Sequence, residues 1–432
     1  MRRCLSLPFS LLVVLSCASP RGGQVQEASK SHGPLAQKLA PVGDFFRQAV
    51  ARQKLPGALV FVERLDGSER YLETFGSMER ERGRSFDEKT LIRIASMTKP
   101  ITSTAVMMLV EEGKIDLDAP LGRYLPEWAH PTVLGEVSPD GSYSTRPARQ
   151  PLTVRSLLTH TSGLSYRFMG PPLADIYARA GVSDGVGHTE GTLAEQSQKL
   201  AALPLLHEPG EHYTYSLSTD ILGRVIEAVS GRPLDKFLEE RIFEPLGMQD
   251  TFFYPPENRV DEVAVLYRLG PERTLERVPV TGRNLSDGDA VYASDVQTAG
   301  PRTYVSGGGG LLSTVSDYAI FLRMIANKGG HKDQRLLSPA SVDLMTTNQI
   351  GRLRANFFDS GFGLGFAVND DPARAKALGP VGTYFWVGIF SSRFWVDPGS
   401  KLIGICTSQF WDLDDETIDQ CPAQVYQALS RQ

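Results

Sequence analysis

Hydrophobic and polar residues follow helical or strand-like periods in several segments of this chain. Residues 35–54 carry apolar side chains at helical spacing on one face, namely Leu39, Val42, Phe46 and Val50. Two apolar runs follow, PGALVFVERLDG (56–67) and RYLETFG (70–76), and the Asp66-Gly67 pair between them is typical of a hairpin turn. The N-terminal part of the chain therefore predicts a helix followed by two paired strands.

The middle of the chain is mainly helical in its pattern. ITSTAVMMLVEEGKIDLDAPL (101–121) has little charge in its first three turns, which predicts a buried helix. TVSDYAIFLRMIANKGG (314–330) begins with Thr314 as a cap and Asp317 at the third position, and two glycines end it. Shorter helical patterns lie between these segments, in VRSLLTH (154–160) and TDILGRVIEAVSG (219–231).

Strand-like runs return near the C-terminus, and a final helix follows them. The successive runs are GFGLGFAV (361–368), YFWVGIFSSRFWV (384–396) and KLIGICTSQF (401–410). The turn sequence DPGS joins the last two runs. DETIDQCPAQVYQALS (415–430) predicts the closing helix.

Strands at both ends of the sequence with helices between them predict one fold class. We expect an α/β (α+β) protein whose antiparallel sheet is built from both ends of the chain and flanked by helices. A mostly helical insertion should occupy about residues 118–300. Residues 256–305 give no pattern that we can interpret.

The N-terminus resembles an export signal. Residues 1–17 combine two early arginines with an apolar run, and VLSC ends at Cys17 as bacterial lipoprotein signals do. We expect an exported protein, periplasmic or anchored to the outer membrane through lipidated Cys17; a simple cleaved signal is the alternative. Residues 18–34 are polar and predict a flexible tether, and residues 35–432 form the folded domain.

Composition and charge narrow the function classes. The 432 residues are 41% hydrophobic and 22% charged, as in a soluble globular protein, and the formal charge of -5 gives no reason to expect a nucleic-acid partner. HEPGEH (207–212) has a Pro-Gly centre that predicts a loop, so we expect no metal and no cofactor. Cys406 and Cys421 either pair or remain two buried thiols.

The segment RIASMTKP (93–100) places Ser96 three residues before Lys99. Residues at this spacing share a helix face, so the lysine can reach the serine hydroxyl, which needs a base to become a nucleophile. Burial and the positive end of a helix both lower a lysine pKa, and the same helix end offers N–H groups to an oxyanion. On spacing alone, an equal alternative is that Ser96 caps the helix and Lys99 extends to water.

Several segments resemble one known family in family order. RIASMTKPITSTAVMMLVEEGKIDLDAPLGRYLPEW is similar to the first motif of the serine β-lactamase and penicillin-binding superfamily, closest to family VIII carboxylesterases with a class C β-lactamase fold. The resemblance covers most of residues 40–410, through LTVRSLLTHTSGLSY, EPGEHYTYSLSTDILGRVIEAVSG, FEPLGMQDTFF, GGGGLLSTVSDYAIFLRMI, GFGLGF and FWVDPGSKLIGI.

The resemblance implies roles for particular residues. Ser96 would be the nucleophile, Lys99 a base, and Tyr215 the partner that relays the serine proton, with Tyr213 as a rival. The backbone N–H groups of Ser96 and Ile389 would bind the oxyanion. Two other features are interpreted as structural rather than catalytic. His160 resembles a structural family position, and Gly307–Gly310 lacks the lysine of a phosphate loop, so it predicts a close backbone approach beside the site.

Two motifs depart from the β-lactamase pattern. Tyr-x-Asn corresponds to Tyr215-Ser216-Leu217, and Lys-Thr-Gly corresponds to Trp386-Val387-Gly388. Trp386 offers apolar area where a lysine would bind a carboxylate, and Leu217 removes an amide. We therefore expect Trp386, Gly388 and Leu217 to contact substrate.

These observations predict a serine hydrolase that forms an acyl-enzyme on Ser96. Its substrate would be a small ester or amide, and we favour a carboxylesterase acting on short-to-medium acyl esters. A β-lactamase or DD-peptidase, an acyltransferase, and a non-catalytic penicillin-binding-like module are the alternatives.

Overall fold

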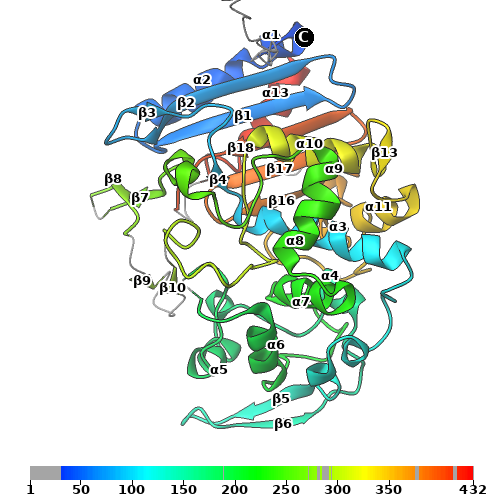
Figure 1. Ribbon diagram of the computed structural model, residues 1–432. Coiled ribbons are helices and arrows are strands. Elements are labelled where there is room, and N and C mark those ends of the chain that lie inside the picture. Colours follow the sequence, from blue (N-terminus) through cyan, green and yellow to red (C-terminus); the bar gives the residue numbers. More distant parts are fainter. Residues whose placement is uncertain are drawn as a thin grey trace, which may run out of the picture.

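The computed structural model describes residues 31–187, 189–270, 272–279, 283–284, 291–292, 294–374, 379–411 and 416–431. The expected signal segment 1–17 and most of the expected tether lie outside the described residues. Figure 1 shows a sheet between two groups of helices, with a lower lobe formed by the middle of the chain.

A single eight-stranded sheet is assembled from both ends of the chain, as the sequence predicted. The strands run in the order β14-β15-β16-β17-β18-β1-β2-β3, and every neighbouring pair is antiparallel. Their bounds are β1 Gly57–Arg64, β2 Arg70–Glu79, β3 Arg84–Ser85, β14 Gly361–Phe362, β15 Ala367–Val368, β16 Tyr384–Gly388, β17 Ser392–Asp397 and β18 Leu402–Thr407. The two chain ends meet where β1 pairs with β18, from Leu59 opposite Thr407 to Arg64 opposite Leu402.

Helices cover both faces of this sheet (Figure 1). On one face lie α1 Gly33–Lys38, α2 Ala40–Ala51 and α13 Cys421–Ser430; on the other lie α3 Thr98–Glu111, α10 Val315–Ala326 and α11 Pro339–Thr346. Because the sheet is covered twice, β17 and β18 are buried along their whole length. Because both faces of these two strands are buried, their sequences are continuous apolar runs and do not alternate between apolar and polar residues.

The middle of the chain forms the lower lobe and the strand pairs around it. Its helices are α4 Val154–Leu158, α5 Leu173–Arg179, α6 Leu193–Ala201, α7 Ser218–Ser230, α8 Leu234–Leu238 and α9 Glu244–Leu246. Two-stranded ribbons also occur there: β5 Thr132–Val137 with β6 Tyr143–Pro147, β7 Tyr267–Leu269 with β8 Leu275–Arg277, and β9 Arg283–Asn284 with β10 Val291–Tyr292. The insertion is therefore less helical than the sequence predicted.

Smaller elements complete the chain. Two further ribbons pair β4 Ile92–Arg93 with β11 Leu312–Ser313 and β12 Gly330–His331 with β13 Gln334–Arg335. Short 3-10 and π turns are η1 Ala95–Met97, η2 Leu121–Arg123, η3 Pro126–Trp128, η4 Arg167–Met169, η5 Glu239–Phe243, η6 Glu257–Glu262 and η7 Pro372–Arg374.

Element boundaries differ from the sequence prediction at three places. The first helix is interrupted at Leu39, just before Pro41. Residues 384–396 form a hairpin of β16 and β17 rather than one strand, turning at Ser391, whose φ is +53°. The last helix begins at Cys421 instead of residue 415, with Pro422 in its first turn, where a proline is tolerated.

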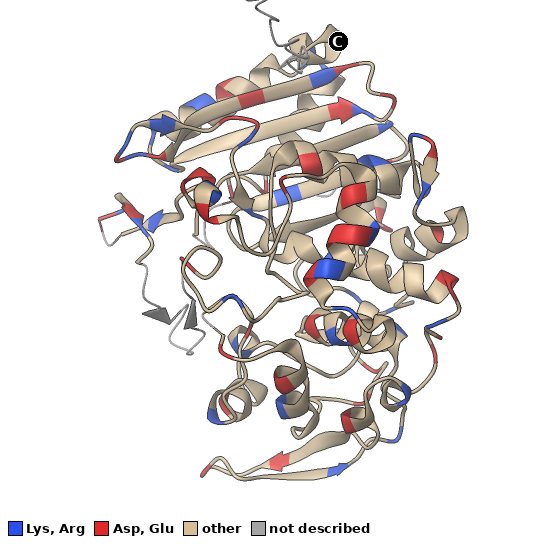
Figure 2. Ribbon diagram, viewed as in Figure 1, with Lys and Arg blue, Asp and Glu red and all other residues tan. Residues whose placement is uncertain are grey.

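Charged residues of both signs are interspersed over the outer helices and ribbons, whereas the strands at the centre of the sheet carry few (Figure 2). No helix within the described ranges is both long and apolar enough to span a bilayer.

Candidate active site

Ser96 lies on the short turn η1 that leads into α3. The residue before it, Ala95, has a φ of +44°, in the left-handed region that a side chain makes unfavourable. The Met97 N–H donates to Ile94 O at 3.0 Å and closes the turn. The turn keeps Ser96 out of the regular helix and at the wall of a pocket, which sequence spacing alone does not reveal.

Lys99 is buried in the first turn of α3, and its ammonium nitrogen is fully surrounded. Nζ donates to Ser96 Oγ at 3.2 Å, to Tyr166 OH at 3.0 Å and to Gly308 O at 2.7 Å. Burial lowers the pKa of Lys99 to about 7, while the charge of Asp220 acts in the opposite direction. The alternative in which Lys99 extends to water is therefore excluded, because its side chain is only 2% exposed.

Tyr215 approaches Ser96 from the segment before α7. Its hydroxyl donates to Ser96 Oγ at 2.6 Å, and Lys99 Nζ lies 4.5 Å from the centre of its ring. Burial raises the pKa of Tyr215 well above its ordinary value, so the ring carries a neutral hydroxyl. The hydroxyl of the rival Tyr213 has no hydrogen-bond partner among the described residues and does not line the pocket.

Sequence reasoning did not single out Tyr166 or Asp220, two buried groups next to Lys99. Tyr166 comes from the loop after α4, and its hydroxyl accepts from Lys99. Asp220, in the first turn of α7, accepts from Tyr304 OH at 3.0 Å. Burial raises the pKa of Asp220, and Lys99 counteracts this shift. No sequence signal marks either residue, because both reach Lys99 from distant parts of the chain.

The two residues predicted to supply the oxyanion donors both line the pocket. Ser96 belongs to η1 and Ile389 follows the end of β16. Gly388 allows this close approach, since a Cβ there would lie 2.5 Å from Ile94 O. The absence of a side chain at Gly388 thus lets the Ser96 turn pack directly onto β16.

The pocket around Ser96 has a volume of about 490 Å³, and its lining includes six aromatic side chains. Trp386 lies in its wall, with its ring centre 5.4 Å from that of Tyr215. None of the described residues that line it is a lysine, arginine or histidine, whereas Asp184 and Asp419 are acidic. Burial raises the pKa of Asp184 to about 6.

The expectation that Leu217 contacts substrate is wrong for this structure. Leu217 precedes α7, is fully buried in the main hydrophobic core and does not line the pocket. Its position next to Tyr215 in sequence does not bring its side chain to the same place, because the chain turns into a helix there.

The glycine segment is a close backbone approach, as predicted. Gly308 and Gly309 line the pocket, and a Cβ on Gly308 would lie 2.5 Å from the Asp220 carboxylate. His160 is buried behind Tyr215, with ring centres 4.9 Å apart, and its Nδ1 lies 3.2 Å from Ser216 Oγ. The glycine segment thus forms part of the pocket wall, whereas His160 packs behind Tyr215 and does not line the pocket.

The possible metal pattern HEPGEH is part of a loop in the structure. His207 uses both ring nitrogens locally, with Glu208 O and Thr214 Oγ1 each 2.9 Å away. Across the described part of the chain, no group of three or more His, Cys, Asp or Glu residues is arranged to hold a metal ion.

A disulfide fixes one side of the pocket. Cys406 in β18 and Cys421 at the start of α13 are bonded, with their Cα atoms 6.5 Å apart. The pocket residues Ile418 and Asp419 lie just before Cys421. Asp419 Oδ1 also accepts from the buried Arg393 at 3.0 Å, so this wall is anchored twice.

Ser96, at the wall of the pocket, is thus within hydrogen-bond distance of the buried Lys99 and Tyr215, an arrangement that supplies a hydroxyl nucleophile with a neighbouring base. The model of the beta-lactamase family matches residues 42–420, and the chain belongs to this family. It is 36% identical to the esterase EstB of Burkholderia gladioli over 84% of this chain and 87% of that protein.

Two further similarities lie in the same group of enzymes. The chain is 30% identical to monacolin J acid methylbutanoyltransferase of Aspergillus terreus, over 69% of this chain and 68% of that protein. Among solved structures it resembles EstCE1, described as a hydrolase with promiscuous acyltransferase activity, with a TM-score of 0.76 and 28% identity over 91% of this chain and 99% of that one.

Proposed function

We propose that this protein is a serine hydrolase of the carboxylesterase type that forms an acyl-enzyme on Ser96. The observation that carries the proposal is the position of Ser96 Oγ, which is within hydrogen-bond distance of both Lys99 Nζ and Tyr215 OH at a pocket wall. A nucleophile needs such a neighbouring base, and the low pKa of Lys99 makes a neutral amine available near pH 7.

The reaction would proceed by two acyl transfers. Neutral Lys99 takes the Ser96 proton, directly or through Tyr215, while Oγ bonds to the ester carbonyl carbon. The carbonyl electron pair moves to the oxygen, which the N–H groups of Ser96 and Ile389 stabilise. As the tetrahedral intermediate collapses, the ester C–O bond breaks and the leaving alcohol takes a proton from Tyr215, which Lys99 resupplies. Water then repeats the sequence and releases the acid.

The lining of the pocket supports neutral ester substrates of short-to-medium acyl length. Trp386 and its aromatic neighbours provide apolar area, worth about 0.8 kcal/mol per buried CH₂ of an acyl chain. The described lining offers no cation for the carboxylate of a penicillin or a stem peptide, so a β-lactamase or DD-peptidase is a weaker candidate. Acyl transfer to an alcohol differs from hydrolysis only in the molecule that accepts the acyl group from Ser96. The similarity to the methylbutanoyltransferase of Aspergillus terreus supports such transfer as a side reaction.

The test combines covalent labelling with two substrates. Wild-type protein should gain one fluorophosphonate adduct by intact mass, and Ser96→Ala should gain none while keeping its circular dichroism spectrum. p-Nitrophenyl butyrate should be hydrolysed with a higher kcat/KM than nitrocefin. An adduct that persists on Ser96→Ala would refute the nucleophile, and a preference for nitrocefin would favour the β-lactamase alternative.

We also propose that the protein is exported and tethered to a membrane through Cys17. The support is the N-terminal sequence, in which two arginines, an apolar run and VLSC precede the cysteine. Wild-type protein expressed in a bacterial host should incorporate labelled palmitate and fractionate with membranes. Cys17→Ala should lose both properties; incorporation that survives this substitution would refute the tether.

A further inference from the structure

Residues 351–360, here called the mouth loop, bring two phenylalanines to the pocket. The loop follows α11 and leads into β14, and both Phe357 and Phe358 line the cavity around Ser96. Phe357 is 54% exposed and, with Val381, is the most exposed large hydrophobic side chain in the described part of the chain. The Phe357 ring is therefore a partly solvent-exposed apolar surface in the pocket of the candidate nucleophile, and a bound molecule could cover it.

The rings of the mouth loop rest directly on the site. The Phe357 ring meets Tyr215 edge to face, with centres 5.5 Å apart and planes at 84°. The Phe358 ring meets Trp386 in the same manner at 5.9 Å and Phe385 at 5.1 Å. Phe358 thus fills the wall behind the pocket, while Phe357 extends that wall outward from the Tyr215 ring.

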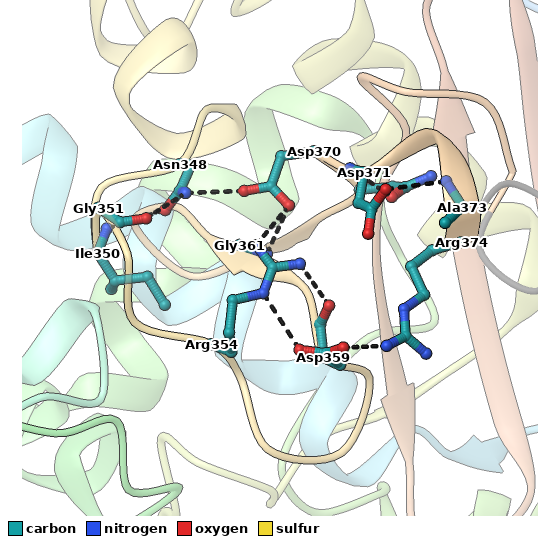
Figure 3. A network of polar contacts seen from close by, with 11 residues as sticks. Asn348, Ile350, Gly351, Arg354, Asp359, Gly361, Asp370, Asp371, Ala373 and Arg374 are labelled. Atoms are coloured by element: carbon teal, nitrogen blue, oxygen red, sulfur yellow. Dashed lines mark hydrogen bonds and ion pairs between the residues drawn. The ribbon is translucent and has the colours of Figure 1, made fainter.

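A polar clamp centred on Arg354 holds the mouth loop in place (Figure 3). Arg354 Nη1 donates to Asp370 Oδ1 at 2.8 Å, and its Nε donates to Asp359 Oδ1 at 3.3 Å. Arg354 Nη2 also donates to the Asp359 carbonyl, and Arg374 pairs with the Asp359 carboxylate. Arg354 and Asp359 lie on either side of Phe357 in the sequence. The Arg354 guanidinium therefore joins the two ends of this short segment to each other and to Asp370, which follows β15.

Further bonds attach the start of the mouth loop to the same carboxylate (Figure 3). Asn348 Nδ2 donates to Asp370 Oδ2 at 2.8 Å and to Gly351 O at 3.0 Å. Within the loop, the Ala355 N–H donates to Ser360 O at 2.8 Å. Such partly exposed ion pairs add little to the free energy of unfolding, but a forked guanidinium fixes the geometry of the segment that it spans.

The chemistry of Tyr215 indicates which half of an ester would meet Phe357. In the proposed reaction, Tyr215 OH gives its proton to the leaving alcohol oxygen, so the alcohol must lie on the Tyr215 side of Ser96. The predicted oxyanion donors are instead the N–H groups of Ser96 and Ile389, and both residues line the pocket. Phe357 extends the wall outward from the Tyr215 ring and is therefore next to the path of the alcohol group.

We propose that Phe357, held by the Arg354 clamp, determines specificity for the alcohol half of the ester, and that it favours bulky apolar alcohols such as aryl-methyl ones. This inference rests on the proposed esterase function. A flat alcohol would cover the exposed face of Phe357, whereas a small alcohol such as ethanol would not reach it. Arg354 is a positioning residue in this proposal, since it acts on substrate only through the loop.

The first experiment compares two esters that share one acid. Ethyl acetate and benzyl acetate give the same acetyl-enzyme, so they differ only in acylation. Phe357→Ala should lower kcat/KM for benzyl acetate ~10-fold, the scale of an aromatic contact, and change that for ethyl acetate less than about twofold. Deacylation, measured from the burst with p-nitrophenyl acetate, should keep its rate constant. Val381→Ala, which removes an equally exposed side chain outside the pocket lining, is the matched control.

The second experiment tests the clamp. Arg354→Gln should lower the ratio of kcat/KM for benzyl to ethyl acetate in the same direction, and Arg354→Lys should restore only part of it, because a lysine cannot bridge both carboxylates as a fork. Lys328→Gln breaks a more exposed ion pair, with Asp343, outside the mouth loop and should leave the ratio unchanged. Melting temperatures of all variants separate a local change from unfolding.

Specific outcomes would overturn the inference. If Phe357→Ala retains the wild-type benzyl-to-ethyl ratio, the inference is wrong while the esterase proposal stands. A second measurement uses p-nitrophenyl esters of different acyl lengths, in which the leaving group is constant. If Phe357→Ala changes kcat/KM among these esters as strongly as it changes kcat/KM between benzyl and ethyl acetate, the inference is also wrong. If wild-type protein hydrolyses no ester and takes no fluorophosphonate, the proposed function fails and the inference fails with it.

Discussion

Replacing Gly388 with alanine tests whether the Ser96 turn and β16 must touch. The new Cβ would lie 2.5 Å from Ile94 O and closer still to Ser392 Oγ. The serine side chain can rotate away, but Ile94 O is backbone and belongs to the turn that carries Ser96. An ordinary contact begins near 3.4 Å, so the turn and the strand must separate by about 0.9 Å.

A separation of this size should act mainly on catalysis. The two predicted oxyanion donors, at Ser96 and Ile389, lie on the two parts that Gly388→Ala pushes apart. Misplacement of reacting groups by about 1 Å costs on the order of 10²-fold, or ~2.7 kcal/mol in the activation free energy. Overpacking should also lower the free energy of unfolding by about 1–3 kcal/mol.

The assay measures kcat/KM for p-nitrophenyl acetate together with urea unfolding. Gly399→Ala is the control, because Gly399 is exposed in a turn and the only atom near its new Cβ would be Asp397 Oδ1 at 3.3 Å, close to an ordinary contact. Gly388→Ala with Ser392→Ala should recover little activity, since the contact with Ile94 O remains. Full activity in Gly388→Ala, or full recovery in the double variant, would refute this explanation of how the site is assembled.

Three other predictions follow from the site. kcat/KM should rise with pH through about 7 and then level off, because the base Lys99 is active only when deprotonated and burial lowers its pKa to about 7; a flat profile from pH 5 to 9 would contradict this role. Trp386→Lys should slow ester turnover and tighten binding of carboxylate-bearing lactams, measured by KM and Ki, and the reverse result would discount Trp386 as the reason for ester preference. Replacing Cys406 and Cys421 with serine should lower the free energy of urea unfolding by about 3 kcal/mol, and two free thiols in the non-reduced wild-type domain would exclude the bridge.

The sequence predicted those parts of the site that depend on local spacing. Ser96 and Lys99 are three residues apart, so the spacing predicted their contact, although Ser96 lies in the turn before α3 rather than in the helix itself. Tyr215 came from the family resemblance, since nothing local distinguishes it from Tyr213. Tyr166 and Asp220 could not be found in this way, because they reach Lys99 only after the lobe folds against α3.

The fold was predicted in outline, and its errors have local causes. The apolar run 384–396 concealed a turn, because Ile389 and Phe390 are hydrophobic although they lie at the end of the hairpin. The prediction for Leu217 failed since adjacency in a motif does not fix the direction of a side chain. The mouth loop offered no periodic pattern, and its position depends on hydrogen bonds and ion pairs between residues up to 22 positions apart.

The pairing of β1 with β18 has a consequence for the order of folding. Residues 57–64 leave the ribosome more than three hundred residues before their partners at 402–407, so this interior pair of the sheet cannot form until synthesis is almost complete. Closing so large a loop is slow, and until then β1 presents an open apolar edge that favours aggregation. A chain that ends before residue 402 would keep that edge permanently. The segment from residue 402 onward therefore decides whether β1 is covered by a partner strand, although it includes none of the three residues assigned to acyl transfer.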